Sequence, residues 1–139
     1  MICLIRIRGE VGVRREIEET LNRLRLKKKY SCIVIANPKE EQLGMIKKVK
    51  DFVAFGEINS SMFEKLLEKR GQPVDKTKKI NSKEAAKDIE KGKKYEELNL
   101  KPFFRLHPPR GGIKSKESFP KGVLGNHKDK INELLERML

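Results

Sequence analysis

Positively charged side chains dominate the chemistry available to this chain. Its 139 residues include 33 Lys and Arg against 20 Asp and Glu, a formal net charge of +13 at pH 7. The excess is +6 up to Gly71 and +7 after it, so no single basic tail carries it. A surface selected for solubility or heat tolerance explains many charges but not the imbalance of sign. The imbalance indicates a protein that binds nucleic acid, because Lys and Arg neutralise phosphates.

Two cationic segments are the strongest candidates for phosphate contact. The first helix that the sequence predicts ends in five cations, namely Arg23, Arg25, Lys27, Lys28 and Lys29. Cations at a helix C-terminus ordinarily contribute about 0.3–1 kcal/mol each, which accounts for one or two of the five. The second segment, residues 101–128, holds seven Lys or Arg and one acid.

Within this second segment, residues 102–116 read Pro-Phe-Phe-Arg-Leu-His-Pro-Pro-Arg-Gly-Gly-Ile-Lys-Ser-Lys. The apolar run with Phe103 and Phe104 could join a sheet, but Pro108 and Pro109 cannot continue a helix or supply ladder donors. The two glycines permit backbone conformations that are closed to other residues. Such an extended cationic segment buries little of its own surface, and we expect a polyanion as its packing partner.

A third candidate is the Gly9-Glu10-Val11-Gly12 run, followed by Arg14 and Arg15. It could form a nest of backbone amides around a phosphate. An ordinary turn between a strand and a helix is the interpretation we favour, because it needs no function and Glu10 would repel an anion, although Arg14 and Arg15 keep a phosphate site open. Few aromatic residues fall in basic contexts, so base stacking is not indicated. We expect recognition of RNA backbone and shape by Arg and Lys.

Metal, cofactor and catalytic chemistry have little support. His107 and His127 have only Cys3 and Cys32 for company, without the spacing of a zinc site, so we expect no metal. There is no Ser/His/Asp order, carboxylate pair or Walker loop, and we expect no cofactor and no catalytic residue.

The cysteines and the hydropathy pattern bear on location. Cys3 and Cys32 lie in apolar runs and are expected to be small buried hydrophobes, which could pair only if they are adjacent in a sheet. Two thiols indicate a reducing compartment. No apolar stretch approaches membrane-spanning length and the N-terminus starts a strand, so we expect a cytoplasmic protein without a membrane partner.

The elements that must position these cations form an α+β pattern. Strands are predicted over 1–8, 30–36 and 52–58, with an amphipathic helix over 13–26 and a second helix capped by Asn37. Gly56 is expected to mark a bulge or a close approach in the third strand. This order predicts a ferredoxin-like βαβαβ sandwich with helices on one face of a small sheet.

A helical and extended C-terminal extension is predicted to follow this core. The Ser61–Glu64 spacing indicates a capping box, residues 81–91 a weaker helix ended by Gly92, and Asn126 the cap of a final helix. We expect residues 1–58 to be an RNA-binding core and residues 59–100 a helical extension with a Lys-rich linker. Residues 101–139 then form the basic Pro/Gly tract and a helix that docks on the core.

Several ordered motifs resemble one known family. They are residues 6–9 (Arg-Ile-Arg-Gly), residues 44–56 (Gly-Met-Ile-Lys-Lys-Val-Lys-Asp-Phe-Val-Ala-Phe-Gly), residues 67–71 (Leu-Glu-Lys-Arg-Gly) and residues 104–112 (Phe-Arg-Leu-His-Pro-Pro-Arg-Gly-Gly). They are similar to the large-subunit ribosomal protein L-thirty family, in its longer archaeal and eukaryotic branch, whose eukaryotic members are called L-seven. The similarity covers essentially the whole chain, and residues 72–100 are its weakest part.

This resemblance implies a non-catalytic structural component of the large ribosomal subunit with a βαβαβ core. It implies 23S rRNA as partner, a position near the 5S rRNA, and neighbouring large-subunit proteins, with no small-molecule substrate. On their chemistry, the side chains and glycines expected to contact RNA are Arg6, Arg8, Arg14, Arg15, Arg23, Arg25, Lys27, Lys28, Lys29, Gly44, Lys47, Lys48, Arg105, His107, Arg110, Gly111, Gly112, Lys114, Lys116 and His127.

Two other functions stay open on the residues alone. One is an RNA-binding regulator that uses the same surface outside the ribosome. The other is a small enzyme, because residues 9–15 resemble the phosphate loop of acylphosphatases on a similar sandwich, with Asn37 as a water-orienting partner. The glutamine of that family's loop is absent here, and such an enzyme would not need the cationic tract.

Overall fold

The computed structural model describes residues 1–9, 12–71, 82–92, 95, 100, 101, 103–110, 122 and 124–139. Three five-residue strands run through its centre: β1 (Ile2–Arg6), β2 (Ser31–Ile35) and β3 (Val53–Glu57). Two-residue strands, β4 (Phe104–Arg105) and β5 (Gly125–Asn126), lie at the edges, so the strand order is β4-β2-β1-β3-β5. Only β3 and β5 are parallel among these pairs.

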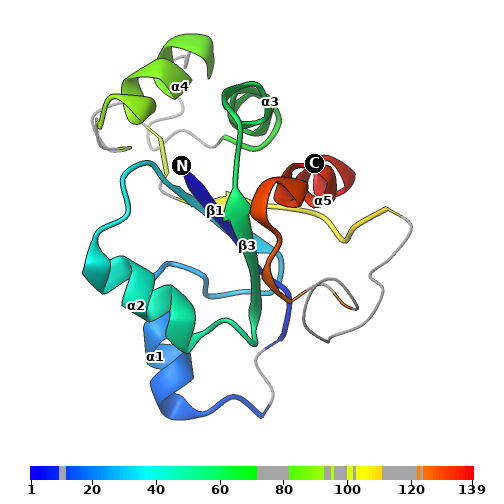
Figure 1. Cartoon of the computed structure of the whole chain (residues 1–139). Coiled ribbons are helices and arrows are strands. Elements are labelled where there is room, and N and C mark those ends of the chain that lie inside the picture. Colours follow the sequence, from blue (N-terminus) through cyan, green and yellow to red (C-terminus); the bar gives the residue numbers. More distant parts are fainter. Residues whose placement is uncertain are drawn as a thin grey trace.

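The helices cover both faces of the sheet (Figure 1). α1 (Arg15–Arg23) and α2 (Glu40–Lys48) pack on one face, where their Leu21 and Ile46 meet Leu4 of β1 in one apolar cluster. The predicted arrangement of the βαβαβ core, with both helices on one side, is confirmed. Apolar periodicity explains it, because residues four apart share one face of a helix and alternate residues share one face of a strand.

The opposite face is covered by the extension. α3 (Ser60–Arg70), α4 (Ser82–Glu90) and α5 (Ile131–Met138, preceded by the 3₁₀ turn Lys128–Lys130, η2) contribute to a second apolar cluster. Phe63, Ile89 and Leu135 belong to this cluster and are at most 1% exposed. The first strand thus has two buried faces, which is why its sequence is nearly all apolar.

Three helix starts differ from the predicted ones. α2 begins after Lys39 rather than at Asn37, and the side chain of Gln42 accepts from the Lys39 N–H at 3.0 Å. α3 is capped by Asn59, whose side chain accepts from the Met62 N–H at 3.0 Å, so the predicted Ser61 capping box is wrong. Asn126 does accept from the Lys128 N–H, at 2.9 Å, but a 3₁₀ turn follows before α5. Equivalent polar residues stand at each start, and local pattern alone does not choose among them.

Gly56 lies where α5 crosses β3. A Cβ added there would stand 2.3 Å from the backbone oxygen of Lys128 and 2.9 Å from the Cβ of Ile131. The β1–β3 register runs without interruption through Gly56. The expected close approach is therefore present, and the alternative of a bulge is not.

The two cysteines lie on neighbouring strands, as pairing would require. Cys3 and Cys32 are both fully buried free thiols with their sulfur atoms 3.3 Å apart. Burial, with smaller contributions from the hydrogen bond and charge of Cys3, raises the pKa of the Cys32 thiol. The pair therefore behaves as part of the apolar core.

The described part of the basic tract caps α5. The His107 N–H donates to the oxygen of Met138 at 3.2 Å and the Arg110 N–H to that of Arg137 at 3.0 Å. The Arg137 Nε in turn donates to the Arg110 oxygen at 3.0 Å. The last carbonyls of a helix have no partner within it, and the tract supplies donors to two of them here.

Candidate nucleic-acid interface

The end of α1 turns sharply at Arg25, one of the predicted RNA contacts. The Leu26 N–H donates to the Leu21 oxygen at 2.9 Å and the Arg25 N–H to the Asn22 oxygen at 3.0 Å, which together form a Schellman motif. Its left-handed position is usually glycine, but Arg25 occupies it with φ of +64°. Tyr30, at the other end of the following loop, also has φ of +64°. Backbone hydrogen bonds anchor residues 25–30 at both ends, since the Tyr30 N–H also donates to the Arg6 oxygen at 2.7 Å.

Arg6 fixes the inside of this loop. Its guanidinium donates from Nη1 to the backbone oxygens of Leu26 at 2.8 Å and Lys27 at 3.0 Å, and from Nε to that of Arg8 at 3.0 Å. Arg6 is 1% exposed, so the expected phosphate contact of this side chain is corrected to a structural role. The alternation of Arg6 and Arg8 indicated a cationic strand face, but the backbone of the loop covers it.

With its backbone held from inside, the loop turns its own cations outward. Lys27, Lys28 and Lys29 are exposed, as are Arg23 and Arg25. The antiparallel pairing of β4 with β2 places Arg105 opposite Ser31, next to this loop. Arg25, Lys27, Lys28 and Arg105, all predicted from the sequence, line a single cavity of about 250 Å³. Four of the candidate side chains, from two distant segments, are therefore brought together.

Aromatic rings accompany these cations, which the sequence reasoning missed. The Arg8 guanidinium lies 5.5 Å from the ring centroid of Phe52, Lys29 Nζ 5.0 Å from that of Tyr30, and the Arg105 guanidinium 5.8 Å from that of Phe103. All three rings are half-buried. In each pair the cation is close enough for attraction by the ring. Period-two alternation through residues 103–105 could have revealed Phe103, because Phe104 beside it is fully buried on the other face.

A second, larger cavity of about 510 Å³ adjoins the first through Arg25. Arg23, Arg25 and Lys39 are its cations, and Ile33 and Ile35 of β2 contribute apolar lining. The Tyr95 hydroxyl donates to the Val34 oxygen at 2.7 Å. Burial, and then the charges of Cys32 and Cys3, raise the pKa of Tyr95, so this hydroxyl stays a donor. Lys39 was not among the predicted contacts.

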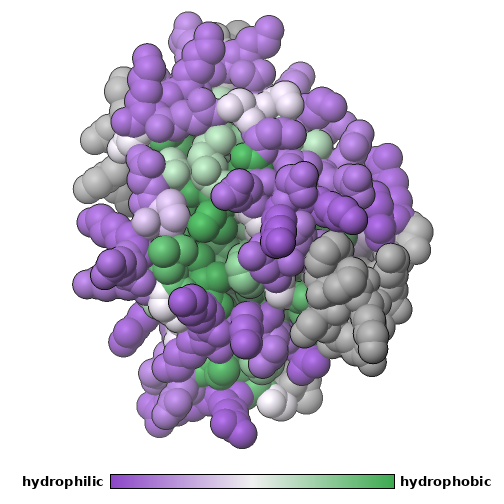
Figure 2. All heavy atoms as spheres, in the orientation of Figure 1, coloured by the Kyte–Doolittle hydropathy of each residue, from purple (hydrophilic) through white to green (hydrophobic). Residues whose placement is uncertain are grey.

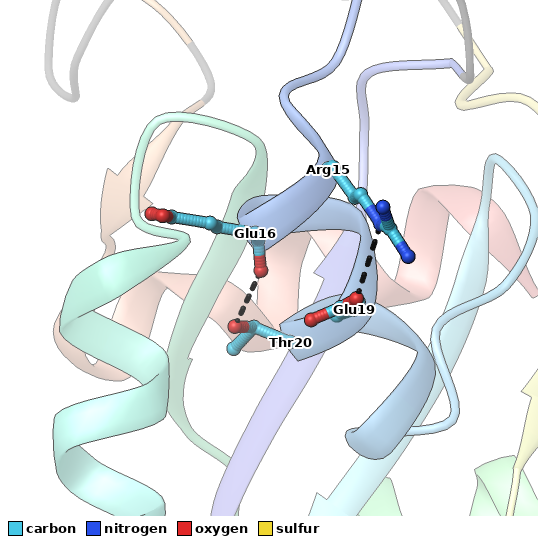
Figure 3. Close-up of polar contacts among 4 residues, drawn as sticks. All are labelled: Arg15, Glu16, Glu19 and Thr20. Carbon is cyan, nitrogen blue, oxygen red and sulfur yellow. Dashed lines mark hydrogen bonds and ion pairs between the residues drawn. The ribbon is translucent and has the colours of Figure 1, made fainter.

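Other predicted residues are exposed but lie apart from the loop. Arg14 and Arg15 stand at the start of α1, a whole nine-residue helix away from Arg23. Figure 3 shows the Arg15 guanidinium directed along the helix to Glu19, 3.4 Å away, beside the bond from Thr20 Oγ1 to the Glu16 oxygen at 2.9 Å. Lys47 and Lys48 occupy the last turn of α2, and Gly44 on the same helix has open space around it. On the side of the molecule seen in Figure 2, hydrophilic residues cover much of the surface around a central apolar area.

The two histidines are engaged within the fold. His107 forms hydrogen bonds through Nδ1 with the Pro108 oxygen at 2.6 Å and through Nε2 with the Leu139 oxygen. His127 is 6% exposed, so the expectation of a surface contact is corrected to a buried position directly after β5, where its backbone N–H donates to the Phe55 oxygen at 2.7 Å. Arg110 is exposed. Gly111, Gly112, Lys114 and Lys116 lie outside the described residues.

The remaining chemistries find no site within the described ranges. No group of three or more His, Cys, Asp or Glu among those residues could hold a metal ion. None of the helices in this part of the chain is long and apolar enough to cross a membrane. The enzyme alternative depends on residues 9–15, of which 10 and 11 fall outside the described residues.

Comparison with known proteins gives similarity over the whole chain. The family model described as Ribosomal protein L30p/L7e matches residues 2–53. The large ribosomal subunit protein uL30 of Archaeoglobus fulgidus is 43% identical, with 99% of each chain covered. The protein of the same name from Desulfurococcus amylolyticus is 39% identical, with 100% of this chain and 98% of that protein covered. The one from Methanopyrus kandleri is also 39% identical, over 96% of this chain and 100% of its own.

Proposed function

The chain belongs to the ribosomal protein L30p/L7e family, and on this premise we propose that it is a non-catalytic structural component of the large ribosomal subunit. Its partner is 23S rRNA near the 5S rRNA, with neighbouring large-subunit proteins around it, in the cytoplasm. It binds through contacts of Arg and Lys with phosphates. The same surface could serve an RNA-binding regulator, and the experiment below separates the two.

One observation carries the proposal. Arg25, Lys27 and Lys28 of the loop after α1 line a single cavity together with Arg105 of β4. The backbone of the loop is held by the buried Arg6. Cations on a backbone that is already held in place around a concave surface suit a polyanion, because binding then requires little further ordering of the backbone.

The proposal is tested by sedimenting a lysate on a gradient and probing the fractions for the protein, with and without RNase. We expect co-migration with large subunits that survives moderate salt and is lost after RNase. Residence in light fractions under both treatments would contradict the ribosomal role and favour an RNA-binding regulator or an enzyme. Turnover of an acyl phosphate that is lost in Arg14→Ala would identify the enzyme.

A matched pair of variants tests the surface itself. The loop variant combines Lys27→Glu with Lys28→Glu, and the control variant combines Lys65→Glu with Lys69→Glu on α3. Each lowers the net charge by four at exposed positions. Between 50 and 200 mM salt, about 6–10 phosphate contacts lose 10³–10⁵ in affinity. We expect the slope of log K against log salt to fall by about two in the loop variant and by less in the α3 variant. Equal slopes in both variants would contradict the assignment of this surface.

A further inference from the structure

The cavity of about 250 Å³ beside the loop has more than cations in its lining. Besides Arg25, Lys27, Lys28 and Arg105 it is lined by Phe103 and Ser31. Phosphate contact alone needs only exposed cations, which the rest of the surface supplies. A concave site with an aromatic wall and a hydroxyl is a different kind of feature.

The aromatic wall is placed by strand geometry. Phe104 is fully buried in the cluster under α3, α4 and α5, so the adjacent residue Phe103 faces the opposite side of the sheet, where it is half-buried against the cluster that contains Leu21. The Arg105 guanidinium lies 5.8 Å from the Phe103 ring centroid. Aromatic rings and guanidinium planes are the two surfaces on which proteins stack unpaired bases. The Ser31 hydroxyl can both donate and accept at a base edge.

The backbone of Arg25 gives independent support. The left-handed conformation at φ of +64° ends α1 in a Schellman motif, where glycine fits without steric cost. An arginine at a backbone position that is sparsely populated for residues other than glycine motivates a functional role for its guanidinium. Arg25 lines the cavity beside Lys27 and Lys28, so three cations stand next to the aromatic wall.

We propose that this cavity receives a single unstacked nucleotide of the bound RNA. Its base lies against the Phe103 ring and the Arg105 guanidinium, and its flanking phosphates meet Arg25, Lys27 and Lys28. This inference rests on the proposed RNA-binding function, which it makes more specific. It adds contact with a base to a surface that otherwise contacts backbone phosphates.

Two substitutions of Phe103 test the stacking, with affinity for large-subunit rRNA measured over a salt series. Loss of one stacked base reduces affinity by about 5- to 150-fold. We expect this loss in Phe103→Leu at every salt concentration with an unchanged salt slope, because stacking releases no counterions. Phe103→Tyr keeps the ring and should bind within about twofold of the unsubstituted chain. Circular dichroism checks that both variants are folded.

Arg25→Gly tests the cation without disturbing the turn. Glycine suits the left-handed position, so this variant should fold at least as well and yet bind RNA more weakly, with a salt slope lower by about one. Reduced binding in a fully folded variant would separate the role of the guanidinium from that of the backbone.

Fluorescence reports on the base directly, because the chain contains no Trp. In F103W the indole should be quenched by a short single-stranded oligoribonucleotide but not by inorganic polyphosphate or ribose 5-phosphate. L43W places the reporter on an exposed position of α2 and should not be quenched by any of the three.

The outcomes distinguish this site from the proposed function. Steep salt dependence in the unsubstituted chain, combined with native affinity in Phe103→Leu or equal quenching of F103W by polyphosphate, would overturn the nucleotide site and leave the RNA-binding function intact. Absence of salt-dependent binding in the unsubstituted chain would overturn both.

Discussion

The buried cation Arg6 supports the surface on which other cations act. Its guanidinium donates to the backbone oxygens of Leu26, Lys27 and Arg8 at 2.8–3.0 Å. Leu26 and Lys27 belong to the loop after α1, and Arg8 lies just after β1. Arg6 therefore joins these two segments. A guanidinium spreads five N–H donors over three nitrogens in one fixed plane and so reaches carbonyls that lie several ångströms apart, whereas an ammonium has three donors on a single nitrogen.

Arg6→Ala should therefore destabilise the fold strongly. It leaves several carbonyl groups without their donor, and we expect a loss of about 2–5 kcal/mol in the free energy of unfolding, measured with urea. Arg6→Lys should recover only part of this loss. Arg15→Ala is the matched control, because its side chain is 92% exposed and its removal should change stability by less than about 0.5 kcal/mol. Equal stabilities of Arg6→Ala and Arg15→Ala would show that Arg6 does not support the loop.

Residue patterns predicted which segments carry cations but not which side chains reach the surface. Arg6 and Arg8 alternate with Ile5 and Ile7, a pattern that indicates an exposed strand face. The backbone that covers Arg6 lies about twenty residues later, and no local pattern reveals it. His127 is buried for a similar reason, because its position depends on packing against β3, more than sixty residues earlier in the chain.

At the scale of elements, the tightest junction is the crossing of α5 over β3 at Gly56. Gly56→Ala would put a Cβ within 2.3 Å of the Lys128 oxygen, and overpacking of this kind costs about 1–3 kcal/mol. Gly44→Ala on α2 is its control: nothing lies within 4 Å of the added Cβ, and alanine in a helix stabilises by about 0.5–1 kcal/mol. Urea unfolding should move the two variants in opposite directions. Stabilisation of both would mean that α5 does not pack this closely.

Element types were largely predictable, and their ends and layers only in part. Strands 1–8, 30–36 and 52–58 enclose the observed β1, β2 and β3, because β-branched apolar runs are a local signal. The Asn37 and Ser61 caps were wrong by two residues each: Asn59 is an equally suitable cap just before Ser61, whereas α2 starts after Lys39, which local preference would not select. That α3 and α4 cover the second face with α5 follows from long-range packing of Phe63, Ile89 and Leu135. The mutual placement of Arg25 and Arg105 around one cavity depends on the β2–β4 register, which pairs residues far apart in the sequence.

For the molecule as a whole, the net charge of +13 opposes the compact state when no polyanion is present. The ion pair between Arg15 and Glu19 does little to offset this, because both side chains are mainly exposed, at 92% and 58%. The same charges that favour RNA should thus repel one another in the free protein. Salt screens both the repulsion within the protein and the attraction to RNA. It should therefore raise the stability of the free protein and lower its affinity for RNA.

We therefore expect salt to stabilise the free protein while it weakens RNA binding. Raising NaCl from 10 to 200 mM shortens the Debye length from about 30 to below 10 Å, and we expect about 1 kcal/mol of added stability. That change corresponds to a rise in Tm of about 3–5 °C for a chain of this size. Lys28→Glu with Lys47→Glu lowers the net charge by four at exposed positions and should give a smaller rise. A Tm that stays constant or falls with NaCl would mean that local pairing already balances the cations, and the surplus charge would then carry no cost in the absence of RNA.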